Sequence, residues 1–450
     1  MHRKSILFLL AALAMAPGLA AQGPVLGIRE ALGRADSAGY GNRAAEGEAA
    51  AAAARADGAL QGILPTLRVE GGWMRTDEPL GAFGFLLRQR GVTPEAFAPD
   101  ALNYPDAISN WAGGVVAEVP LLNADAWLGR SAASSAAAAG RAQAEWTRSG
   151  TRLDVIRSYY GAVLAAEAVV TLEAAARAAH EHARLTGSLV RNGMVTKSDA
   201  LLAEVRAGEV DAQLLEARSN AGLARRRLAL VMGTPADTLF SLPDSLPAPD
   251  RIRAVAAAAS FGVEVDRGDV TAARLGRQAA ERDARRATGR LLPRLNAFGR
   301  LDWNDPSAPY GGQESWTVGV MASWSPFSGG AELADRSGAR ARARAAAAMA
   351  EAAEAQAALE VVARDSELEV ALERLTIAER SVAQGAEAHR IVARKYEGGL
   401  AAIVELLGAA ATETSTRLGL AQAQYQAIVA DAGRRQARGG DPAALAALEE

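Results

Sequence analysis

The residue types that most often carry chemistry are sparse in this chain and badly spaced for it. There are four histidines and no cysteine. His180 and His182 are two residues apart, which places them on different faces of a helix and not at the i, i+4 spacing of a zinc-binding helix. We interpret both as solvated. The sequence has neither a G-x-x-x-x-G-K-[ST] phosphate loop nor a G-x-S-x-G elbow. It therefore predicts no catalytic residue, no cofactor and no metal site.

Two glycine turns, each with an acidic residue six positions further on, are the remaining candidates. Gly193 precedes Asp199, and Gly399 precedes Glu405. Glycine ends a helix by adopting the left-handed conformation. Ser198 or Asp199 would then cap the next helix, near its positive end. Each turn is therefore predicted to be the bend of a helical hairpin.

The prolines indicate which elements position these turns. None lies between Pro120 and Pro235, and none lies between Pro326 and Pro442. Because proline costs a helix interior about 3 kcal/mol, these alanine-rich gaps predict long helices over about 124–190 and 330–396. Each is followed by its turn and a second helix, the first of which ends near 232. A helix of this length spans roughly 100 Å, and apolar residues at three- and four-residue spacing predict coiled-coil-like packing.

The two proline-free gaps align at one offset of 206 residues, which indicates an internal duplication. Pro120 pairs with Pro326, and Gly193 with Gly399. Each repeat reads helix, strand, loop, strand, long helix, turn and helix. The predicted organisation is a signal peptide over 1–20, a first repeat over 21–240, a linker over 241–265, a second repeat over 266–440 and a tail over 441–450.

Each repeat also contains two segments in which apolar and polar residues alternate. They are predicted strands over about 64–76, 111–122, 292–304 and 315–326. Alternation gives a strand one apolar and one polar face, and about ten residues cross a bilayer at a tilt. A soluble sheet with one wet face shows the same alternation. Five of the seven tryptophans stand near strand ends, as in an interfacial aromatic belt: Trp73, Trp111, Trp303, Trp316 and Trp324.

The N-terminal sequence favours the membrane interpretation. Arg3 and Lys4 precede an apolar run, and Gly18 and Ala20 supply the small residues of a cleavage site, so we expect 1–20 to direct export. No later stretch reaches the roughly 18 apolar residues of a spanning helix. The formal net charge is −3, without a basic patch, which argues against nucleic acid as a partner. With no cysteine, we expect no lipid anchor.

Four strands cannot close a barrel. In lipid every backbone N–H and C=O must be paired, so an open sheet edge is not tolerated. The missing strands must therefore come from other copies of the chain. Three copies would give twelve strands, and two or four copies would also close a barrel.

In its motifs the chain resembles the TolC-like outer membrane efflux proteins, also called outer membrane factors. The family's turn of Gly, five residues and an acidic residue occurs twice here. Residues 326–330 (Pro-Phe-Ser-Gly-Gly) resemble its Pro-Leu-Phe-x-Gly-Gly segment, and 267–270 (Arg-Gly-Asp-Val) resemble the start of its second repeat. The insertion over 78–105 resembles the long first surface loop of some members. The resemblance extends from about residue 28 to residue 439.

What the resemblance implies is a homotrimer that is mainly α with a transmembrane β portion. A 12-stranded β-barrel, four strands per protomer, would lie in the lipid of the cell outer membrane. Long coiled-coil-like helices would continue it as an α-barrel through the periplasm. It would be the exit duct of a tripartite efflux or type I secretion system. Substrates would pass from a periplasmic adaptor (membrane fusion) protein and an inner-membrane pump of the RND or ABC type.

The resemblance also assigns roles to the turns. Ala401 and Gly408 stand where some members have a gate arginine and a second acidic residue. An acidic ring would thus rest mainly on Glu405, whose charge an ordinary helix N-terminus explains equally well. The implied adaptor contacts are Gly193, Met194, Val195, Gly399, Leu400 and Ala401, and the implied periplasmic gate region is Asp199, Tyr396 and Glu405.

Two other classes of protein remain as alternatives. An exported coiled-coil structural or adhesin-like protein without a channel would have the same helices, but the four strands argue against it. A periplasmic enzyme would need a polar cluster that the sequence lacks. The transported substrate is not apparent from the sequence.

Overall fold

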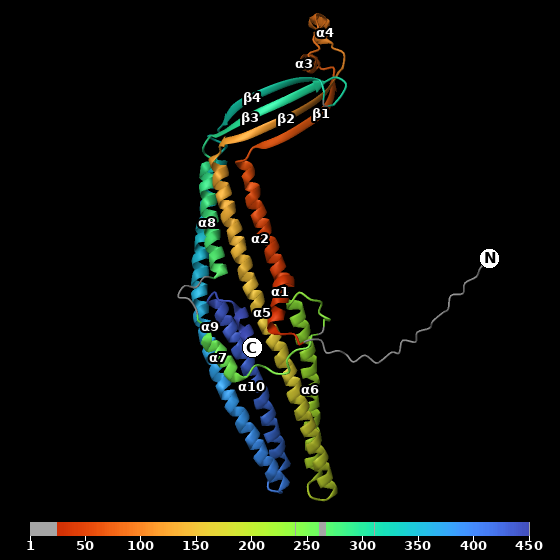
Figure 1. The fold of residues 1–450 in the computed structure, drawn as a ribbon, viewed down its shortest axis with the longest axis vertical. Helices are drawn as coiled ribbons and strands as arrows, with labels where there is room; N and C mark the ends of the chain where they lie inside the picture. Colours follow the sequence, from red (N-terminus) through yellow and green to blue (C-terminus); the bar gives the residue numbers. More distant parts are fainter. Residues whose placement is uncertain (1–24, 239, 261–266, 310, 450) are drawn as a thin grey trace, which may run out of the picture.

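The protein is a long rod with a small sheet at one end and two helical hairpin tips at the other (Figure 1). The computed structural model describes residues 25–238, 240–260, 267–309 and 311–449. The predicted signal peptide lies outside the described residues. Within them, no helix combines the length and the apolar character needed to cross a membrane.

Two helices run the whole length of the shaft, from the sheet to the tips. They are α5 (Ala124–Arg191, 68 residues) and α9 (Ala331–Glu397, 67 residues), compared with the predicted 124–190 and 330–396. At 1.5 Å per residue each is about 100 Å long. Their alanine-rich, proline-free sequences allow this, because alanine has the highest helix propensity and no proline interrupts the backbone hydrogen bonds.

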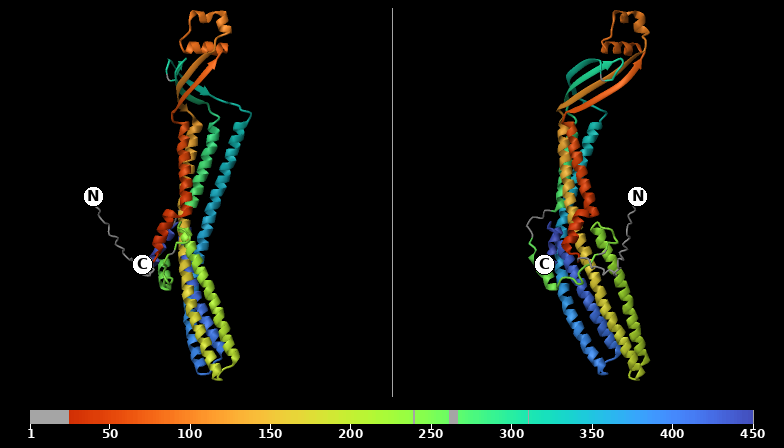
Figure 2. Two further views of the ribbon diagram at one scale, coloured as in Figure 1. Left: turned by 90° about the vertical axis from the view of Figure 1, so that its right-hand side faces the viewer. Right: turned by 45° about the vertical axis from the view of Figure 1, so that its right-hand side comes forward.

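Shorter helices complete the shaft in two tiers. We call the middle of the shaft, where the two tiers meet, the waist. From one side of the shaft to the other, the neighbouring helices above the waist are α2, α5, α8 and α9, and those below it are α6, α5, α10 and α9. Figure 2 shows the two tiers meeting at the waist. The sides of this curved layer are formed by α2 and α6 on one flank and by α9 on the other. The bounds are α2 (Tyr40–Gly58), α6 (Lys197–Val231), α8 (Gly268–Gly289) and α10 (Ile403–Ala437).

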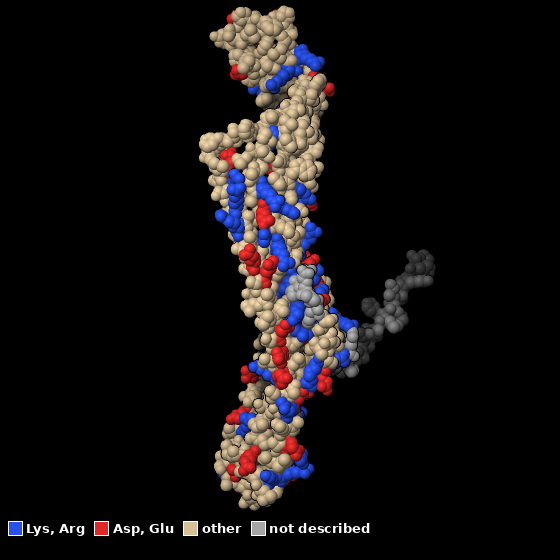
Figure 3. Space-filling model, turned by 90° about the vertical axis from the view of Figure 1, so that its left-hand side faces the viewer, with Lys and Arg blue, Asp and Glu red and all other residues tan. Residues whose placement is uncertain are grey.

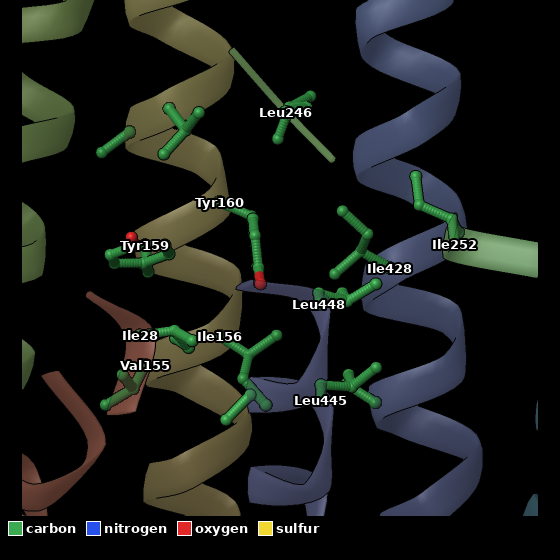
Figure 4. Packing of buried hydrophobic residues seen from close by; sticks show 14 of the residues in the cluster. Ile28, Val155, Ile156, Tyr159, Tyr160, Leu246, Ile252, Ile428, Leu445 and Leu448 are labelled. Atoms are coloured by element: carbon green, nitrogen blue, oxygen red, sulfur yellow. The ribbon is translucent and has the colours of Figure 1, made fainter. Parts of the chain in front are cut away.

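The main hydrophobic core lies at the waist (Figure 4). There α1 (Ile28–Ala38), α7 (Pro249–Ala258) and the 3-10 helix η3 (Pro442–Glu449) pack on α5, α9 and α10. Tyr159 donates its hydroxyl to the Leu26 carbonyl at 2.9 Å and lies 2.5 Å from a carboxylate oxygen of Glu449. Glu449 also accepts from the backbone N–H of Ile28. Through Glu449, η3 therefore binds both α1 and α5 and holds α1 against the shaft.

The segments predicted as a linker and a tail both contain helices. The linker over 241–265 contains α7, whose Ile252 is buried in the waist core, and the tail over 441–450 contains η3. The first-repeat insertion is also structured, with α3 (Pro79–Arg88), η2 (Pro94–Phe97) and α4 (Pro99–Asn103). The first repeat opens with α1, α2 and a short 3-10 helix, η1 (Ala59–Gly62), where one helix was predicted.

The sheet is antiparallel, with the strand order β1-β2-β3-β4. Its strands are β1 (Thr66–Thr76), β2 (Ile108–Leu122), β3 (Arg294–Asp305) and β4 (Gln313–Ser323). β2 and β3 come from different repeats and form the central pair. Among the described strands, β1 and β4 each pair on one side, so both leave an open edge.

Candidate functional site

The register places the apolar sides of all four strands on one face of the sheet. Val69, Val115, Leu301 and Trp316 form one row across it, and the same holds for the neighbouring rows. Trp316 is 74% exposed. We call this the apolar sheet face, and its members are Leu67, Val69, Trp73, Trp111, Val115, Ala117, Val119, Leu295, Ala297, Leu301, Trp303, Trp316, Val318, Val320 and Ala322. A broad exposed apolar surface of this kind marks contact with lipid or protein.

The opposite face of the sheet is polar and is held by side-chain hydrogen bonds. Asn110 donates to Asn304 at 2.9 Å. Asn296 donates to the Glu118 carboxylate at 2.7 Å. Arg300 and Asp302 of β3 form an ion pair on this face. The two faces differ as the lipid and lumen sides of an outer-membrane barrel do.

Four of the five tryptophans of the predicted aromatic belt stand toward the ends of the sheet, whereas Trp316 lies in the central row with Val115 and so departs from the prediction. Trp73 and Trp111 are direct cross-strand partners, with ring centroids 6.4 Å apart. They lie at the end away from the helices. Trp303 follows one row inward, opposite Gly113, where an added Cβ would come within 2.1 Å of the indole nitrogen. Trp324 lies just beyond β4, at the helical end, and donates to the Leu291 carbonyl at 3.1 Å.

Further exposed apolar residues lie at the helical end of the sheet, and sequence reasoning missed Trp127 among them. Besides Trp324, the junction between strands and long helices exposes Leu121, Leu122, Trp127 and Phe327. Trp127 belongs to the first turns of α5, so the strand pattern did not include it. The available signal was that Trp127 follows closely in the sequence after Leu122, where the predicted strand ends. On the face shown in Figure 3, charged side chains gather over the helices, while the sheet shows few.

At the first tip a Schellman motif ends α5. Gly193 has φ +71° and donates its N–H to the Val190 carbonyl, and the Met194 N–H reaches Leu189. The N-cap of α6 is Thr196, and the predicted cap residues Ser198 and Asp199 are inside the helix. Asp199 instead completes a capping box by accepting from the Thr196 N–H at 3.0 Å.

The second tip has the same bend with a different cap. Gly399 has φ +70°, and the Leu400 N–H reaches the Lys395 carbonyl at 2.8 Å. The N-cap of α10 is Ala402, which has no side-chain oxygen to offer. Glu405 is exposed there, and its carboxylate has no hydrogen-bond or ion-pair partner among the described residues. The two acidic residues of the turns are therefore not equivalent. The Asp199 carboxylate is hydrogen-bonded in the capping box, whereas the Glu405 carboxylate is exposed without such a bond among the described residues.

Tyr396, assigned to the gate region, joins the two hairpins. It is buried with Ile403 and Leu406, and Leu189 of α5 packs against them. Its hydroxyl lies 3.5 Å from the hydroxyl of Thr186, also on α5. Met194 and Leu400, two of the expected adaptor contacts, are exposed at the ends of the hairpins.

His180 and His182, two residues apart on α5, have different surroundings. His180 is exposed, as predicted, and its Nε2 atom lies within hydrogen-bond distance of the Asp211 carboxylate, at 3.0 Å. The prediction was wrong for His182, whose Nε2 atom is buried without a partner among the described residues. Its ring instead meets His389 of α9 with centroids 6.2 Å apart. No group of three or more potential metal-ligating side chains occurs in the described part of the chain.

Exposed apolar side chains of the shaft concentrate on two of its lateral helices, α6 and α9, whereas the lateral helix α2 exposes Tyr40 alone among its large apolar residues. The inner helices α8 and α10 have few of them, whereas α6 and α9 each have a series along their length. On α6 they are Leu201, Leu202, Val205, Leu215, Leu223 and Leu230, and on α9 they are Leu333, Met349, Leu359, Val362, Val370, Ile377 and Ile391. The exposed sides of α6 and α9 are therefore suited to packing against protein.

The sequence matches one known family over both repeats. Residues 43–234 and 264–440 fit the profile of a family described as outer membrane efflux protein. Among curated proteins, none matches the chain.

Several solved structures share the fold over almost the entire chain. The outer membrane protein VceC of Vibrio cholerae is 18% identical, with a TM-score of 0.74 over 92% of this chain and 96% of that one. The CmeC outer membrane channel of Campylobacter jejuni is 14% identical, with a TM-score of 0.75 over 97% and 94%. The open-state MtrE outer membrane channel of Neisseria gonorrhoeae is 18% identical, with a TM-score of 0.73 over 92% and 89%.

Proposed function

Because the chain belongs to the outer membrane efflux protein family, we propose that three copies of it form one continuous duct through the outer membrane and the periplasm. Members of this family are transport channels and not enzymes. The duct is the passive exit of a tripartite efflux or type I secretion system. It receives its substrate from a periplasmic adaptor and an inner-membrane pump of the RND or ABC type.

One observation carries the proposal of a closed ring of copies, while the number three comes from the family resemblance: the sheet and the shaft are open on the same two flanks. β1 continues from the α2 flank and β4 leads into α9. β1 and β4 run in opposite directions, so β4 of one copy beside β1 of the next continues the antiparallel pattern. The same arrangement of copies places the exposed apolar residues of α9 in one copy against those of α6 in the next. Closed rotational symmetry then removes every open edge.

The two sheet faces indicate which side of such a barrel meets lipid and which side lines the conducting lumen. In a closed barrel the apolar sheet face contacts lipid, and the polar face with Glu118, Arg300 and Asp302 lines the lumen. The tryptophans at both ends of the sheet sit at the two membrane interfaces, where amphipathic rings are favoured. Below the membrane the shaft continues the lumen.

The hairpin tips are the proposed contacts with the adaptor. Met194 and Leu400 are exposed apolar residues at glycine bends, 69% and 81% accessible, and such residues are suited to docking. Val195 and Ala401 adjoin them, with Gly193 and Gly399 at the bends. Tyr396 and Glu405 form the gate region, together with Asp199. Three copies of Glu405 around one axis repel each other and attract cations.

Fractionation and planar-bilayer recording test this function together. We expect the protein in the outer membrane fraction, extracted only with detergent, and we expect stepwise ionic conductance after it is added to a bilayer. An exported coiled-coil protein would instead appear in the soluble periplasm and leave the bilayer silent. Recovery in the soluble fraction without detergent would rule out the duct.

A further inference from the structure

The two hairpins of one protomer meet at a small polar joint above the tips. His182 and Thr186 of α5 face His389 and Tyr396 of α9. We call these four residues, together with Glu413 of α10, the inter-hairpin joint. It lies beside a cavity of about 410 Å³ between the hairpins, which is lined by His182, Arg206, His389, Glu413 and Arg417 among other residues. The joint interrupts the apolar contact between the cluster around Leu172 and Leu214 and the one around Tyr396.

The hydrogen bonds of the joint are incomplete. The Nδ1 atom of His389 lies 2.5 Å from a carboxylate oxygen of Glu413, and Glu413 also pairs with Arg417 at 2.5 Å. The Nε2 atoms of His182 and His389 are both buried without a partner among the described residues. Their rings meet nearly at right angles, at 78°. The joint therefore has unused donor or acceptor capacity at the point where the hairpins touch.

The charged groups around the joint would not stabilise a proton on the His182 ring. On α6, Arg206 is paired with Glu209, and on α5 the exposed Glu181 is paired with Arg184. Among the described lining residues Glu413 is the acidic one, and it already serves His389 and Arg417. Burial raises the pKa of the Glu413 carboxyl, but its bonds to His389 and Arg417 outweigh this and lower the pKa overall. Burial and the neighbouring His389 lower the pKa of His182, against a smaller opposing effect of Glu181.

We propose that protonation of His182 loosens the inter-hairpin joint, so that the periplasmic tip opens more readily in acid. This rests on the proposed duct function. The closed joint holds His182 neutral, whereas separated hairpins expose it to water. The closed contact is therefore at full strength above the pKa of a solvated histidine, about 6.5. It weakens progressively below that pH, until the buried ring itself takes up a proton. One proton per protomer changes the ratio of open to closed states by at most tenfold per pH unit.

The test is conductance through the complete protein in planar bilayers at pH 7.5 and pH 5.5. We expect the wild-type open fraction to rise on acidification. His182→Gln removes the titrating group and should remove most of the rise. His389→Gln is a second variant, expected to reduce the rise because it removes the ring that contacts His182 and helps to lower the pKa of His182. His180→Gln is the matched control, since His180 is 59% exposed and paired with Asp211 outside the joint, and it should behave as wild type.

The outcomes separate this proposal from the duct itself. A channel whose open fraction is the same at both pH values contradicts the joint proposal and leaves the duct intact. An acid response that persists in both His182→Gln and His389→Gln also contradicts it, as does a response lost equally in His180→Gln. A wild-type protein that conducts at neither pH contradicts the duct function instead.

Discussion

Val320 and Met321 are adjacent residues of β4 that test which face of the sheet meets lipid. Val320 pairs with Ala297 on the apolar sheet face, and Met321 pairs with Asn296 on the polar face. Asn296 is bonded there to Glu118. Substituting arginine at each position places the same charge at nearly the same depth but on opposite sides of the sheet. We predict that Val320→Arg destabilises the assembly and that Met321→Arg is close to neutral.

The size of the effect follows from the strand geometry. Val320 is two residues from Val318, the middle of the eleven-residue strand. At about 3.3 Å per residue and a tilt of about 40°, its depth is roughly 5 Å from the bilayer midplane. Arginine on the lipid face costs about 2–4 kcal/mol at the midplane and about 0–1 near the interfaces. We therefore expect about 2 kcal/mol per protomer for Val320→Arg, and less than about 0.5 kcal/mol for Met321→Arg.

Guanidinium titration of both variants, refolded into lipid vesicles, measures these free energies of unfolding. A difference of about 2 kcal/mol corresponds to roughly a 30-fold change in the folded-to-unfolded ratio, which such a titration resolves. Equal losses in the two variants would refute the assignment of the faces. A larger loss in Met321→Arg would reverse it.

Three other predictions concern the tips and the waist. Glu405→Gln should weaken block of single-channel current by divalent cations, while Asp199→Asn, whose carboxylate is bonded to the Thr196 N–H in the capping box, should leave block unchanged; equal effects would contradict the acidic ring. Gly193→Ala should lower stability by about 1 kcal/mol, measured by thermal unfolding, since its φ is positive and an added Cβ meets no atom within 4 Å; no loss would contradict the left-handed bend. Tyr159→Phe should cost about 1–3 kcal/mol in denaturant titration, whereas Tyr160→Phe, whose buried hydroxyl has no partner among the described residues, should cost little; the reverse order would contradict the described hydrogen bonds.

The parts of the fold that were predictable are those encoded by local sequence. Proline-free, alanine-rich runs predicted the long helices, and alternation predicted strands whose apolar sides the register brings to one face. The predicted family and fold class are confirmed. The helix cap was less predictable, because Thr196, Ser198 and Asp199 all offer a suitable oxygen within one turn, and the backbone geometry decides among them.

Contacts between the repeats were not predictable from local pattern. His182 and His389 meet across more than two hundred residues, and the i, i+2 spacing to His180 suggested only a solvated helix face. The available signal was the repeat offset of 206, which places His182 level with residue 388 of the equivalent helix. Packing of α7 and η3 into the waist likewise depends on neighbours that no local pattern specifies.

The number of chains in the detergent-extracted complex tests the central claim most directly. One chain has a mass of 46.6 kDa, so native mass spectrometry of the extracted protein distinguishes one copy from several. We predict three copies, the number that the resemblance to the TolC-like outer membrane efflux proteins implies, since two or four copies would also close the sheet. A stable single chain with its strands folded in water would contradict the account.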